Sequence, residues 1–156
     1  MDNKYYTPDE DEFCKGFEYE VFEEAPKDID PNWLTFVPVP EEDTWFKFKF
    51  PDPYVGWNLP LLLRRKIRVK YLDREDFEEV LNRKQLKGDD VELNFQVIVS
   101  DRIMYEFDYD TDILELTVEM FVEDLERGKS HCYPLFDGVV KNKLELKKLL
   151  KQLKIQ

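Results

Sequence analysis

Strict alternation of apolar and polar residues marks several short stretches of this chain, and that pattern is typical of β-strands with one buried face. Single strands are expected at residues 17–22, 33–39, 45–50, 67–71 and 132–140. Residues 91–123 alternate in three successive runs separated by short turns, which predicts an antiparallel meander. We also expect three aromatic side chains of the 45–50 strand to fill the core: Phe46, Phe48 and Phe50.

Helical spacing appears in three other places. The Thr7-Pro8 pair predicts a two-turn helix over 8–15, because Thr can cap a helix and Pro fits its first position. Asp73 is expected to cap a helix from Arg74 to about Asn82. The clearest helix covers 143–154. It is capped by Asn142, and its apolar stripe consists of Leu146, Leu149, Leu150 and Leu153.

These elements predict an α+β fold. We expect an antiparallel sheet of about six to seven strands, with two or three helices packed on one face. Residues 1–156 have the length of a single domain, which includes a strand and loop region rich in Pro and aromatic residues at 23–60.

Composition changes this picture mainly through charge. The 156 residues include 35 acids and 23 Lys or Arg, giving a net charge of −12. Such a field repels phosphate backbones and anionic membranes, so nucleic-acid and membrane partners are not expected, whereas a protein with a basic surface is attracted. No apolar run approaches the ~20 residues of a membrane span, and only two cysteines occur, so a cytoplasmic protein is expected.

Signatures of enzymes are scarce. His131 is the one histidine, and Cys132 next to it would point to the opposite face of a strand. Cys14 could approach His131 only through the fold. Neither a zinc site nor a Cys-His pair is therefore expected, and we predict no catalytic residue and no cofactor.

A weak candidate for a metal site remains. Asp108, Asp110 and Asp112 have the spacing of the first three ligands of a calcium-binding loop. Ile113, however, occupies the position where such a loop needs Gly for its sharp turn. An acidic hairpin turn is the preferred interpretation, and no metal is expected.

Aromatic residues in the Pro-rich region are candidate binding residues, because Trp and Tyr combine a large rigid surface with a polar group. Basic residues follow directly and can bind an anion or neutralise the acidic loops. The candidate residues for a ligand or partner are Trp33, Trp45, Tyr54, Trp57, Arg64, Arg65 and Arg68.

Three stretches of the chain are distinctive when taken together: Tyr5 to Pro8 with Phe13 and Gly16 to Glu20, Ile67 to Asp76, and Lys141 to Lys143 with Glu145 to Leu153. Together they resemble a family of small uncharacterised proteins encoded by phages and prophages of gut Bacteroidota. The resemblance implies a mobile-element protein that works in a bacterial cytoplasm, and it implies no activity, cofactor or catalytic residue.

Three hypotheses about function follow. The favoured one is a non-enzymatic acidic interaction protein of a phage or prophage, which binds a host or defence protein with or without inhibiting it. The first alternative is a protein that binds or sequesters a small anionic ligand such as a nucleotide signal, with Trp side chains stacking on the base and Arg holding phosphate. The second alternative is a minor phage structural or assembly protein.

Overall fold

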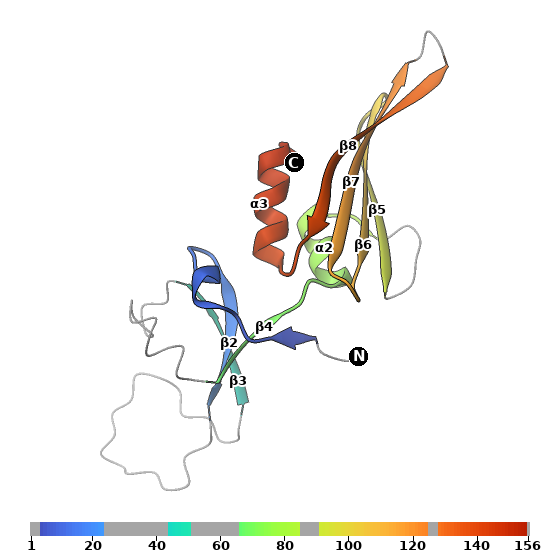
Figure 1. Ribbon diagram of the computed structural model, residues 1–156. Helices are drawn as coiled ribbons and strands as arrows, with labels where there is room; N and C mark the ends of the chain where they lie inside the picture. Colours follow the sequence, from blue (N-terminus) through green and yellow to red (C-terminus); the bar gives the residue numbers. More distant parts are fainter. Residues whose placement is uncertain (1–3, 24–43, 51–65, 85–90, 125–127, 156) are drawn as a thin grey trace, which may run out of the picture. The chain divides into compact units, whose positions relative to one another are not determined.

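The computed structural model describes residues 4–23, 44–50, 66–84, 91–124 and 128–155. The chain divides into two compact units, Met1–Lys70 and Tyr71–Gln156, each built around its own antiparallel four-stranded sheet (Figure 1). The α+β class is therefore confirmed, although the strands form two sheets where the alternation alone suggested one. The single domain predicted for residues 1–156 stays a prediction.

The sheet of the first unit has the strand order β1-β4-β2-β3. Strand β4 pairs with both β1 and β2, so residues distant in the sequence form its centre. The strands are β1 (Tyr5–Tyr6), β2 (Glu18–Glu23), β3 (Thr44–Lys49) and β4 (Ile67–Lys70). Strands β2, β3 and β4 confirm the predictions at 17–22, 45–50 and 67–71, whereas that at 33–39 lies outside the described residues.

One face of this sheet forms the core of the first unit. Phe17, Tyr19 and Val21 are at most 2% exposed, and the ring of Phe13 lies edge-on against Phe17 and Tyr19. The expectation that the β3 aromatics fill the core was wrong in degree. Phe46, Phe48 and Phe50 lie on the expected side but are only half-buried, because β3 is the edge strand of this sheet.

The two-turn helix expected at 8–15 is not formed. The segment instead makes a short 3₁₀ turn, η1 (Glu10–Glu12), with Asp9 at its N-cap position. The Asp9 backbone N–H donates to Glu12 Oε2 over 2.8 Å, so the capping box lies two residues later than predicted. A helix this short gains little stability from its own hydrogen bonds. Side-chain contacts hold the segment instead. The Tyr6 hydroxyl donates to Glu12, and the Phe13 ring packs against Phe17.

The second unit contains the predicted meander, with strand order β5-β6-β7-β8. Its elements are α2 (Arg74–Leu81), β5 (Glu92–Ser100), β6 (Ile103–Asp110), β7 (Glu115–Asp124), β8 (Lys129–Val139) and α3 (Lys143–Leu153). Strand β8 starts three residues earlier than predicted. Its register with β7 shifts next to Pro134, where a Pro cannot donate to the ladder.

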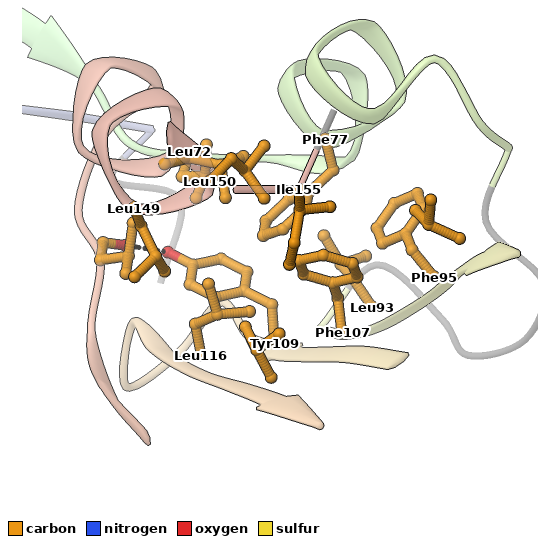
Figure 2. Close-up of a cluster of buried hydrophobic side chains, with 14 residues drawn as sticks. Leu72, Phe77, Leu93, Phe95, Phe107, Tyr109, Leu116, Leu149, Leu150 and Ile155 are labelled. Carbon is orange, nitrogen blue, oxygen red and sulfur yellow. Dashed lines mark hydrogen bonds between the residues drawn. The ribbon is translucent and has the colours of Figure 1, made fainter. Parts of the chain in front are cut away.

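Helices α2 and α3 cover the same face of this sheet (Figure 1). Aromatic side chains form part of the core between these helices and the sheet. Phe77 of α2 stacks on Phe95 of β5, with 5.1 Å between the ring centroids. Tyr109 is also buried, and its hydroxyl donates to the Val140 carbonyl over 2.9 Å (Figure 2). Burial and nearby carboxylates, above all Glu145, raise the pKa of Tyr109, so this phenol stays protonated.

Both predicted helix caps of this unit are confirmed. Asp73 accepts a hydrogen bond from the Asp76 backbone, and Asn142 accepts from the backbones of Leu144 and Glu145. At its other end, α3 stops at Lys154 in the left-handed region, which turns Ile155 into the core. None of the described helices is long and apolar enough to cross a membrane.

Candidate functional site

The candidate site is the face of the β5–β8 sheet that α2 and α3 leave uncovered, here called the open face. Alternation along each strand places every second side chain on it. Cross-strand pairing arranges these side chains in three rows. The rows are Glu92, Asp110, Glu115 and Val139; Asn94, Asp108, Thr117 and Asp137; and Gln96, Glu106, Glu119 and Pro134. Seven of the twelve are carboxylates, and none is basic.

Part of the open face is hollowed. The hollow has a volume of about 710 Å³, and none of the described residues that line it is basic. Its acidic lining residues are Glu92, Glu106, Asp108, Asp110 and Glu115. A concave surface of this size with one sign of charge concentrates the field and attracts cations or basic groups.

Side-chain amides of strand β5 hydrogen-bond two of the carboxylates of the neighbouring strand β6. The Asn94 amide donates to Glu106 over 2.9 Å and to Asp108 over 2.5 Å, and Gln96 donates to Glu106 over 3.4 Å. These amides hold the two carboxylates in place. The open face is therefore an ordered array of charge rather than a set of loose side chains.

Apolar side chains accompany the carboxylates. Val139 is 60% exposed and Ile98 is 66% exposed, both on the open face, and Ile113 is 58% exposed in the turn beside the hollow. Exposed apolar groups beside a charged hollow are typical of surfaces that bind proteins, because burial of such groups adds affinity that charge alone does not.

The weak candidate for a calcium site does not assemble. Among the described residues, no group of His, Cys, Asp and Glu side chains is placed to hold a metal ion. Asp108 and Asp110 both lie on the open face, but Asp108 accepts from the Asn94 amide and Asp110 accepts from the backbones of Asp112 and Ile113. Asp110 thus closes the β6–β7 turn, as the hairpin interpretation predicted.

The predicted aromatic and basic site is only partly described. Trp33, Tyr54, Trp57, Arg64 and Arg65 lie outside the described residues. Its other two members, Trp45 of β3 and Arg68 of β4, lie together in the first unit, with the guanidinium carbon 3.8 Å from the centre of the indole.

Two further residues complete this group, and the sequence prediction missed both. Tyr5 lies on the other side of Arg68, at 3.7 Å, and Glu20 accepts a hydrogen bond from Arg68 Nε over 2.7 Å. No local signal could have found them, because β1, β2 and β4 come together only through the sheet.

The histidine and the cysteines are placed as follows. His131 and Cys132 are both exposed, on opposite faces of β8, and Cys14 is half-buried in the first unit. Local desolvation and the Glu119 carboxylate raise the pKa of Cys132, so the thiolate that a nucleophile needs is scarce at neutral pH.

Comparisons with family models, curated proteins and solved structures gave no match to this chain.

Proposed function

We propose that the protein is a non-enzymatic interaction protein that binds a basic protein surface through the open face. The observation that supports this most is the separation of charge within Tyr71–Gln156. The open face carries its seven carboxylates without a base in the three rows, whereas α3 on the other side of the sheet exposes Lys147, Lys151 and Lys154.

Folding explains only one part of this arrangement, the Asp110 carboxylate that closes the β6–β7 turn. Glu106 lies directly opposite Glu119, and Asp110 lies between Glu92 and Glu115. Like charges directly opposite each other in a sheet destabilise it. Solubility requires net charge but does not require that carboxylates oppose one another across strands. A face that lowers stability in this way is best explained by a partner that neutralises it.

The chemistry of the face specifies the partner. Lys or Arg side chains would enter the hollow, and apolar groups beside them would cover Ile98, Ile113 and Val139. Charge complementarity of this kind speeds association and selects against acidic partners, while the apolar contacts slow dissociation. In the context of a phage or prophage, the partner would be a host or defence protein, inhibited because its basic site is covered.

The experiment compares two triple variants of equal charge. The face variant is Glu106→Gln, Asp108→Asn and Glu115→Gln, in which the new amide oxygens at positions 106 and 108 can still accept from Asn94. The control variant, Glu10→Gln, Asp11→Asn and Asp101→Asn, changes three exposed acids elsewhere. Wild type and both variants are used to capture proteins from a lysate of a gut Bacteroidota species, and captured proteins are then purified and titrated against all three.

We expect a basic protein that wild type and control bind and that the face variant loses, with affinity that falls as salt rises. Equal binding by the face variant and the control would contradict the role of the open face. Sedimentation of the purified chain tests whether a second copy of the protein binds the open face. Self-association that the face variant abolishes would show that it does, and would overturn the proposal of a foreign partner.

A further inference from the structure

The strongest unexplained feature outside the open face is the arginine sandwich of the first unit, defined as Tyr5, Arg68, Trp45 and Glu20. The guanidinium lies between two rings, 3.7 Å from the centre of Tyr5 and 3.8 Å from that of Trp45. Its Nε donates to Glu20 Oε2 over 2.7 Å, and the side chain remains 27% exposed. Within the described part of the chain, the Arg68 side chain makes no other hydrogen bond or ion pair.

This arrangement fixes the guanidinium while using only one of its nitrogens. Arg carries five N–H donors in a planar fork that matches two oxygens of one anion, and Nε supplies only one of the five. Stacking on both faces holds the plane of the fork. Less rotamer freedom is therefore lost when an anion binds to the remaining donors, Nη1 and Nη2.

The neighbours of Arg68 that the structure describes are mainly positive, in contrast to the acidic chain as a whole. Lys66 precedes it by two residues and lies on the same face, 4.6 Å from the centre of the Phe22 ring. Lys47 lies opposite Glu20 in the register of β2 and β3. Both lysines are exposed, and neither has an ion-pair partner in the part of the chain that the structure describes. Glu20 balances only one of the three cations.

We propose that the arginine sandwich binds a phosphate group through Nη1 and Nη2 of Arg68. A dianion is favoured over a carboxylate, because two positive charges remain after Glu20 has been balanced. The guanidinium covers one face of the Tyr5 ring and one face of the Trp45 ring. In this site the two rings therefore orient Arg68, and the phosphate is bound by Arg68 itself. This inference does not depend on the proposed function, which concerns the other unit.

The test is a titration of the full-length chain with inorganic phosphate at constant ionic strength and pH 7.5. The side-chain ¹⁵N–¹H signals of Arg68 and the indole N–H signal of Trp45 are followed by NMR, and the Trp45 signal is the readout in the two lysine variants. The matched variants are Arg68→Lys, which keeps the charge but removes the fork, and Arg102→Lys, the same change at an exposed turn. A titration with acetate serves as the carboxylate arm.

We expect a saturable shift of the Arg68 signals in the wild type, with half-saturation at millimolar phosphate. Followed on the Trp45 indole, the half-saturation concentration should be at least tenfold higher in Arg68→Lys and unchanged in Arg102→Lys. Trp45→Phe should weaken binding severalfold, because the smaller ring positions the fork less well. Shifts that do not saturate, that spare Arg68, or that are equal in both lysine variants would overturn the proposal. Equally tight binding of acetate would overturn the assignment to phosphate. If Arg68→Lys fails to fold, the wild-type Arg68 signals alone decide.

Discussion

Removing charge from the open face should make the protein more stable. The perturbation is the double variant Glu115→Gln and Glu119→Gln, which removes the like-charge pairs with Asp110 and Glu106. Each like-charge pair directly opposite in a sheet is worth about 0.2–1 kcal/mol. We therefore expect the free energy of unfolding to rise by about 0.4–2 kcal/mol at low salt.

Salt provides the internal check on that gain. At 1 M salt the Debye length is about 3 Å, so repulsion between these partly exposed carboxylates is largely screened. The gain should then shrink to a small fraction of its low-salt value. The matched control, Glu10→Gln and Asp101→Asn, removes the same charge from positions outside the rows and should change stability little.

The assay is urea unfolding followed by far-UV circular dichroism, with separate fits to each transition if the two units unfold independently. Tryptophan fluorescence is unsuitable for the second unit, because Trp33, Trp45 and Trp57 all belong to Met1–Lys70. A loss of stability in the double variant, or a gain that persists unchanged at 1 M salt, would refute the idea that the open face is held at an electrostatic cost.

Three further predictions concern the second unit and use the same unfolding assay. Asn142→Ala should cost about 1–2 kcal/mol, because the cap accepts from two backbone N–H groups, whereas Asn142→Asp should retain most of the stability. Leu146→Ala should cost about 2–5 kcal/mol, since this fully buried side chain would leave a cavity under α3. Tyr109→Phe should cost about 1–3 kcal/mol below pH 10 by leaving the Val140 carbonyl without its donor. Folding raises the pKa of Tyr109 above the ordinary tyrosine value of about 10, so the wild type should lose stability as pH rises above about 10. The difference in stability between the wild type and Tyr109→Phe should narrow there.

Most of the second unit could be predicted from the sequence, because its strands pair with their neighbours along the chain. Once the turn at Asp101 is placed, alternation alone puts Phe95 and Phe107 on the buried face. The cap at Asn142 and the stripe of leucines similarly define α3 locally. Ile155 was missed, because only the left-handed turn at Lys154 brings it into the core.

The first unit was harder to predict because its sheet is assembled from distant segments. Nothing near β4 in the sequence shows that it lies between β1 and β2. The stack of Arg68 on Tyr5 and its ion pair with Glu20 depend on that order. The segment at 8–15 carried good helix signals, yet a short helix is decided by packing, and Phe13 packs against Phe17 without it.

The open face could be predicted from the sequence only in part. Alternation predicts which acids share a face, but whether Glu106 meets Glu119 depends on the register that the β6–β7 turn sets. Net charge alone therefore predicted a preference for basic partners and left the location of the surface undefined.

The most direct test of the central idea is a hydrogen-exchange footprint of the bound partner on the full-length chain. If the open face is the docking surface, the β6 and β7 backbone amides around Glu106, Asp108 and Glu115 should gain protection when the partner binds. The amides of η1 should not, and the face variant should lose the protection. A footprint on η1 or α3 that leaves β6 and β7 unchanged would contradict it.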